Sequence, residues 1–369
     1  MAAALLVLSA TALGWIAIAR LLPPRETTDN AYVGGEQVPI SARIAGTVAA
    51  VHVRDMQRVR AGDLLVELDA TDARVALDRA RANLAAAVRT VQQMHDAARA
   101  GDAAVFARSL ELEQARADLR RREPLLATQA VAAETIAHAR DAVATAEAAL
   151  RVARHQAAAA RVLVANTAVG QHPNVLAARA AYIDAWLALN RTRIHATVGG
   201  DVVQRTVQPG VRIEPGGVLL KIVRTEALWV DANFKESQLR DLRLGQPVTV
   251  RVDLYGGAAA FRGQVAGFNA GTGAAFALLP PQNAAGNWVK VTQRLPVRIA
   301  LDPVELQTHP LRLGLSARVA VDTRNRAGVP LAPAVDQRQF RETTAPPAQP
   351  AEIEANHIIA AVYRDETRR

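Results

Sequence analysis

The sequence predicts an elongated α+β protein in which a long helical hairpin is inserted into a small β domain, behind an N-terminal transmembrane helix. Three observations predict this class. A strand-turn-strand pattern occurs twice, at a constant shift of 154 residues (200 minus 46), and apolar residues seven apart run between the two copies. About eighteen uncharged residues also precede Arg20, close to the ~20 that cross a ~30 Å hydrocarbon layer.

The composition excludes several classes of function. The net charge is +9, but Arg residues alternate with Asp and Glu, and no Arg/aromatic patch of the kind that grips bases is present, which disfavours nucleic-acid binding. The absence of Cys excludes thiol chemistry and Cys-ligated zinc. The eight His are scattered, without an HExxH motif. We therefore expect no catalytic site, no metal and no cofactor.

Residues 1–25 are expected to form a single-pass membrane anchor. Pro23 and Pro24 end its helix, and Trp15 lies where an aromatic ring favours the membrane interface. A cleaved signal peptide is the alternative, because residues 17–19 read Ala-Ile-Ala. Retention is favoured because no Lys or Arg precedes the apolar run. The residues expected to anchor the chain are Leu5, Leu8, Leu13, Trp15 and Ile18.

The repeated pattern, in residues 46–68 and 200–222, predicts one β domain made of two halves. The copies align without a gap, and their matching glycines are Gly46 with Gly200 and Gly62 with Gly216. Each copy alone is a small sheet that cannot bury its apolar face, whereas two copies packed face to face can. We place this split domain at 41–70 and 194–226.

Residues 71–193 are predicted to form an antiparallel coiled-coil hairpin. Apolar residues recur every seven positions, and a second run of the same period begins after a break near Pro124. Only a short connection separates the runs, so the second folds back along the first. The first ladder consists of Leu77, Leu84, Val91, Ala98, Val105, Leu112 and Leu119, and the second of Ile136, Val143, Leu150, Ala157 and Val164.

Four stretches resemble the periplasmic adaptors, or membrane fusion proteins, of the HlyD/EmrA family, and they are most similar to its EmrA-type multidrug efflux branch. They are TTDNAYVGGEQVPISARIAGTV (27–48), AWLALNRTRI (185–194), LWVDANFKESQLRDLRLGQPVTVRVDLYG (228–256) and GTGAAFALLPPQNAAGNWVKVTQRLPVRIAL (271–301). The resemblance identifies the split domain as lipoyl-like. It also implies a β-barrel from 29–40 and 227–322, where several segments alternate as strands. We expect residues 323–369 to be a mostly disordered tail, ending in a short helix at 351–363.

The resemblance implies a tripartite multidrug efflux pump. The chain would be held in the inner membrane with its bulk in the periplasm, beside a major facilitator superfamily transporter, and would form a trimer or hexamer. The hairpin tip would contact a TolC-like outer-membrane channel. Efflux adaptors often carry Arg, Leu and Ser at this tip, and the corresponding residues here are Arg121, Leu125 and Ala132, so the Ser is replaced. A merely solvated turn is the alternative for these residues.

Two other functions remain as alternatives. An adaptor of an ABC-type protein secretion system, as in the HlyD branch, would share the same modules. A biotinyl or lipoyl carrier would need a Lys at a turn of the split domain. The two turns carry Met56 and Pro209-Gly210 instead, with no Lys nearby, which disfavours the carrier.

Overall fold

The structure is a computed structural model that describes residues 24–127, 130–164, 167–256, 258–273, 275, 292–331 and 348–366. The chain divides into two compact units. The first combines Met1–Glu67 with Ile194–Thr344, and the second combines Leu68–Arg193 with Ala345–Arg369. The predicted anchor residues Leu5, Leu8, Leu13, Trp15 and Ile18 lie outside the described residues. Within the described ranges, no helix is long and apolar enough to cross a membrane.

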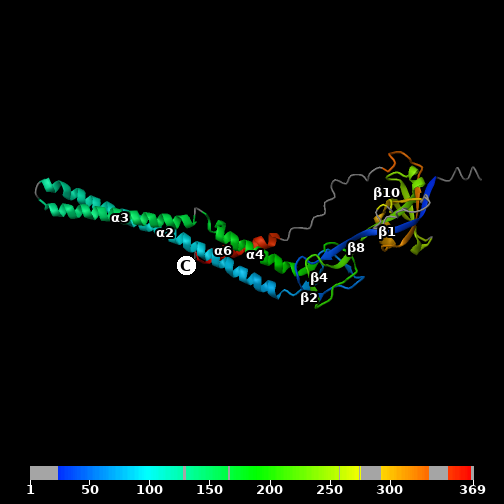
Figure 1. The fold of residues 1–369 in the computed structure, drawn as a ribbon, viewed down its shortest axis with the longest axis horizontal. Coiled ribbons are helices and arrows are strands. Elements are labelled where there is room, and N and C mark those ends of the chain that lie inside the picture. Colours follow the sequence, from blue (N-terminus) through cyan, green and yellow to red (C-terminus); the bar gives the residue numbers. More distant parts are fainter. Residues whose placement is uncertain are drawn as a thin grey trace, which may run out of the picture. The chain divides into compact units, whose positions relative to one another are not determined.

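The second unit contains the helical hairpin. Its outward arm is α2 (Thr71–Ala127), and its return arm consists of α3 (Ala133–Val164), the short 3₁₀ turn η1 (Val169–Gln171) and α4 (Pro173–Arg191), which lie along α2 (Figure 1). Every residue of both apolar ladders is buried or half-buried, which confirms the period-seven prediction. Pro124 does not end α2, which continues for three more residues to Ala127.

The arms are held by small-residue packing and by cross-arm ion pairs. A Cβ atom at Gly101 would lie 3.1 Å from the Cα of Ala157, so the two helices approach closely there. Ion pairs connect the arms between Arg161 and Asp102 at 2.7 Å, Arg116 and Glu147 at 2.6 Å, and Arg140 and Glu123 at 2.9 Å. These pairs are exposed, so each contributes little on its own. They fix the register of the seam instead.

A third helix, α6 (Ala348–Glu366), packs against α2 and α4 (Figure 1). The short helix expected at 351–363 is present, and it is longer than predicted at both ends. Ala351 and Ala355 are fully buried, and Ile358, Ile359 and Val362 pack on the apolar cluster around Leu84 and Tyr182. The helix is ordered because the base of the hairpin supplies an apolar surface that the isolated tail lacks.

The split domain of the first unit is a sandwich of two small sheets. One sheet has the strand order β5-β4-β2-β7, from Arg193–His195, Leu64–Leu68, Gly46–Val51 and Arg212–Ile213. The other contains β3 (Arg58–Val59), β6 (Gly200–Val203), the start of β8 (Val218–Lys235) and the end of β1 (Arg25–Ser41). Each copy of the repeat therefore places its short middle strand in the sheet of the other copy. The halves interlock by this exchange as well as packing face to face.

The hydrogen bonds of the sandwich repeat at the shift of 154. Gly46 pairs with Ile213, and Val59 pairs with Gly200, so exchanging the copies leaves the pairing unchanged. The Gly62 amide donates to the Ala196 carbonyl at 2.8 Å, and the Gly216 amide donates to that of Ala42 at 2.8 Å. Gly62 and Gly216 also share a positive φ, of 91° and 84°, which explains glycine at both positions.

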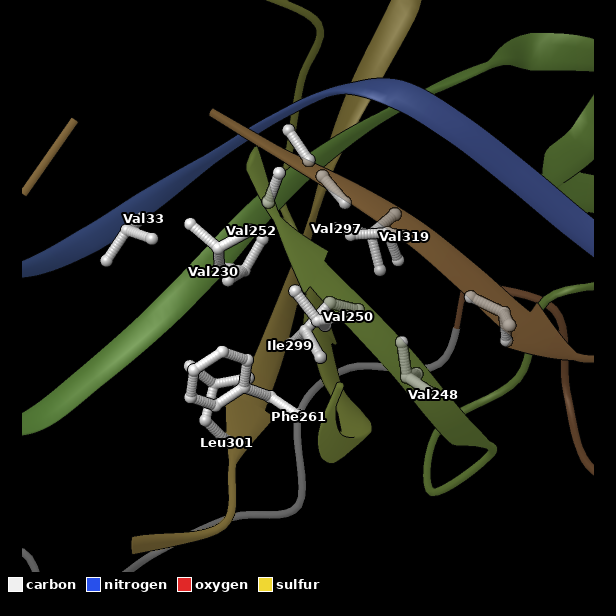
Figure 2. Packing of buried hydrophobic residues seen from close by; sticks show 14 of the residues in the cluster. Val33, Val230, Val248, Val250, Val252, Phe261, Val297, Ile299, Leu301 and Val319 are labelled. Carbon is white, nitrogen blue, oxygen red and sulfur yellow. The ribbon is translucent and has the colours of Figure 1, made fainter. Parts of the chain in front are cut away.

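The remainder of the first unit is a closed six-stranded barrel. Its strand order is β1-β12-β9-β10-β11-β8, and β8 pairs back with β1 to close it. The strands not yet given are β9 (Pro247–Val252), β10 (Phe261–Phe268), β11 (Arg294–Leu301) and β12 (Ser316–Asp322), and one helix, α5 (Pro303–Thr308), follows β11. Inward residues such as Val230, Val250, Ile299 and Val319 alternate with outward polar ones and fill the interior (Figure 2).

Candidate functional site

The tip of the hairpin is the candidate docking site. Arg121 and Leu125 lie one helical turn apart in the last turns of α2, so they share a face. Ala132 is exposed directly before α3 begins. The connection is closed by a hydrogen bond from the Ala130 amide to the Leu125 carbonyl at 3.1 Å. The structure thus brings Arg121 and Leu125 onto one surface of α2 and leaves Ala132 in the connection.

The tip surface combines exposed apolar groups with guanidinium groups. Leu125 and Leu126 are 43% and 39% exposed, so the tip presents two apolar side chains to solvent. Arg121 and Arg122 both pair with Asp118, at 3.3 and 2.9 Å, and the side chain of Arg121 remains 71% exposed. The surface can therefore place an apolar side chain in a groove while a neighbouring Arg donates hydrogen bonds to a partner.

A buried tyrosine, Tyr182, lies at the base of the hairpin, and the sequence alone did not predict its role. Tyr182 of α4 is only 1% exposed and is covered by α6. Burial, together with a hydrogen bond to Glu354, raises the pKa of Tyr182 to about 12. The phenol therefore stays neutral over the whole physiological range and connects α4 to α6.

One carboxylate joins both halves of the sandwich to the barrel. Asp201 of β6 accepts a hydrogen bond from the Arg58 Nε at 2.9 Å and pairs with Arg312, which follows α5. Burial raises the pKa of Asp201, but the hydrogen bonds from Arg58 and Arg312 outweigh it and hold the pKa below its usual value. This network could not be predicted from the sequence, because Arg58 and Arg312 lie far from Asp201 along the chain.

The LWVDANF stretch (228–234), which belongs to the family resemblance, has a packing role. The Trp229 indole donates to Asp231 at 2.7 Å, and the Arg298 guanidinium lies 4.2 Å from the centre of the Trp229 ring. A Cβ atom at Gly34 would lie 2.4 Å from the Trp229 Nε1, so only glycine fits beside the ring. This cluster fastens β8 to β1 and β11. It contains no reactive group.

The turns of the sandwich do not carry a cofactor attachment site. Met56 and Gly210 occupy equivalent turn positions and both have positive φ, of 66° and 86°. Met56 is 90% exposed, and no Lys is present in either turn. Among the described residues, no three His, Asp or Glu side chains come together as a metal site. The glycines Gly46, Gly62, Gly200 and Gly216 all lie in the sandwich, where they support strand pairing and turns.

The helical hairpin is inserted between the two halves of the β sandwich, and the sandwich shares the long strands β1 and β8 with the six-stranded barrel. This combination of modules defines an adaptor of the membrane fusion class. Residues 71–192 match the family described as "EMRA, alpha-helical hairpin domain", and residues 227–322 match "AAEA-like beta-barrel domain".

Curated relatives agree over most of the chain. The chain is 44% identical to the multidrug export protein EmrA of Escherichia coli K12 over 320 residues, which cover 87% of this chain and 82% of that protein. It is 44% identical to the fatty acid resistance protein FarA of Neisseria gonorrhoeae, over 82% of this chain and 77% of the relative. The chain belongs to the EmrA family of periplasmic adaptor proteins.

Solved structures of adaptors are also similar. A structure of the periplasmic adaptor protein EmrA has a TM-score of 0.41 at 16% identity, covering 81% of this chain and 98% of the other. The membrane fusion protein Spr0693 from Streptococcus pneumoniae R6 has a TM-score of 0.48 at 18% identity, covering 82% of this chain and all of the other.

Proposed function

We propose that this protein is the periplasmic adaptor of a tripartite multidrug efflux pump, anchored in the inner membrane by a single N-terminal helix. Its partners would be a major facilitator superfamily transporter in the inner membrane and a TolC-like channel in the outer membrane. The observation that carries the proposal is the exposed Arg-Leu surface at the end of a long hairpin, in a chain of the EmrA family.

The role of the adaptor is mechanical. The hairpin reaches the channel, and α2, with 57 residues at about 1.5 Å each, is roughly 85 Å long. Copies of the hairpin standing side by side would surround the end of the channel, so we propose a trimer or hexamer. The transporter supplies the energy, and the adaptor aligns and seals the path. We infer that the protein has no catalytic activity of its own.

The docking surface is tested by replacing Arg121 with Asp and Leu125 with Ala together. We expect the double variant to lose drug resistance in cells that lack their own adaptor, and to lose cross-linking to the channel. A matched control, Arg154→Asp with Val162→Ala, changes an exposed Arg and an exposed apolar side chain in the second half of α3, away from the tip. Unchanged resistance and cross-linking in the tip variant, at equal expression, would exclude Arg121 and Leu125 from the docking site.

The transporter partner separates this proposal from an adaptor of an ABC-type secretion system. Affinity purification of the full chain from membranes should recover a multi-helix transporter without an ATPase domain. Recovery of an ATPase instead would support the secretion alternative. The mass of the mature chain tests the anchor, because loss of about twenty N-terminal residues would show a cleaved signal peptide.

A further inference from the structure

The outer surface of the barrel carries an open groove of about 1100 Å³, lined by β1, β9 and β12 and by the adjoining ends of β8 and β11. Five basic side chains line it: Arg25, Lys235, Arg251, Arg294 and Arg318. Two carboxylates, Asp29 and Asp253, share the groove, so it keeps an excess of positive charge.

Two of the basic residues face each other across neighbouring strands. Arg318 of β12 and Arg251 of β9 are direct Cα partners in the antiparallel pairing, and both side chains are exposed. Like charges directly opposite each other destabilise a sheet. Asp253 compensates only in part, because it lies 3.6 Å from the Arg318 Nε. Within the described ranges, Arg251, Lys235 and Arg294 have no ion pair with a carboxylate. A bound anion would offset this repulsion.

The place of Arg25 along the chain indicates which anion lies near the groove. Arg25 is the first residue of β1, and it is also the last residue of the segment expected to form the membrane anchor. Asp29 lies four residues further on. At no more than about 3.6 Å per residue, the Arg25 end of the groove lies within roughly 15 Å of the last anchor residues. The phosphates of the lipid headgroups are therefore within its reach.

We propose that this groove binds the phosphate groups of anionic phospholipids. The proposal rests on the membrane anchorage stated above. Arg guanidinium groups bind phosphate oxygens through paired, charge-assisted hydrogen bonds, and Thr27 and Thr249 add hydroxyl groups to the same groove. The groove is larger than one phosphate, so a whole headgroup fits. Lipid binding there would hold the barrel against the membrane beside the anchor.

The test uses the full chain purified in detergent and three soluble probes: dioctanoyl-phosphatidylglycerol, dioctanoyl-phosphatidylcholine and inorganic phosphate. We expect the phosphatidylglycerol to bind in a salt-dependent way and more tightly than the other two probes. Replacing both Arg251 and Arg318 with Gln should weaken that binding about tenfold or more, because each basic side chain near an anionic surface contributes roughly a fivefold factor. The control Arg54→Gln with Arg212→Gln removes two exposed charges outside the groove and should leave binding unchanged.

Three outcomes would overturn the proposal. Equal binding of the two lipids would show that the anionic headgroup is not recognised. Inorganic phosphate binding as tightly as the phosphatidylglycerol would assign the groove to free anions. If the variant with both Arg251 and Arg318 replaced by Gln binds phosphatidylglycerol as tightly as the wild type, and unfolds at the same temperature, the lipid binds elsewhere on the protein. No transporter or channel is present in this assay, so its failure is distinct from a failure of the tip variants in the resistance assay.

Discussion

Replacing Gly200 with Ala tests the interlocked sandwich. A Cβ atom at this position would lie 2.2 Å from the Val223 carbonyl oxygen and 2.8 Å from the Ile222 Cγ2. Ordinary contacts begin at 3.4 Å, so β6 and β8 would have to separate by more than about 1 Å at a backbone contact. Overpacking of this kind costs about 1–3 kcal/mol, and a backbone clash lies at the upper end of that range.

The expected result is a lower unfolding temperature of the first unit. For a unit of this size, about 3 kcal/mol corresponds to a decrease of roughly 6–12 °C, measured by scanning calorimetry. The neighbouring glycine supplies the control, because a Cβ at Gly199 would lie 3.6 Å from the nearest atom, the Val59 carbonyl oxygen. Gly199→Ala should therefore change the transition little. Equal effects of the two substitutions would refute the close approach of β6 to β8.

Three further predictions concern the hairpin and the Asp201 network. Leu84→Ala should lower the free energy of unfolding by about 2–5 kcal/mol because Leu84 is fully buried, whereas Val75→Ala on the exposed face should change it very little. Thermal unfolding followed by far-UV circular dichroism compares the two variants. The pKa of Tyr182 is raised from 10.0 to about 12, so its contribution to stability is complete below pH 10 and is lost as the pH rises toward 12. In Tyr182→Phe, the free energy of unfolding should no longer decrease over this pH range on account of the phenol. The pKa of Asp201 is lowered from 3.8, so its contribution is present above that pH and is lost as the pH falls through the folded value. Asp201→Asn should make the first unit less stable at neutral pH and should remove that part of its acid sensitivity, both read from denaturant unfolding at a series of pH values.

The modules themselves could be predicted because their signals are periodic. Seven-residue spacing fixes which face of α2 is buried against the return arm, so the buried positions Leu84, Val91 and Leu112 follow from the sequence alone. The repeat likewise identified two halves of one domain through Gly62 and Gly216, where a φ of 91° and 84° favours glycine in both copies.

The parts that could not be predicted depend on contacts between distant residues. The exchange of β3 and β7 between the sheets involves strands of two residues each, which are too short to carry a pattern. The helix at 351–363 was expected, but its packing on the hairpin depends on Tyr182 and its apolar neighbours, about 170 residues earlier in the chain. The pairing of Arg251 with Arg318 needs the register of the barrel, which alternation alone does not give.

The central claim, that the hairpin tip docks onto an outer-membrane channel, is tested most directly by cysteine cross-linking. The chain has no Cys, so a single introduced Cys is unique. With a short bifunctional cross-linker in intact cells, Leu125→Cys at the tip should yield an adduct with the channel, and Val162→Cys far from the tip should not. An adduct from Val162→Cys without one from Leu125→Cys, at equal labelling of both, would contradict docking by the tip.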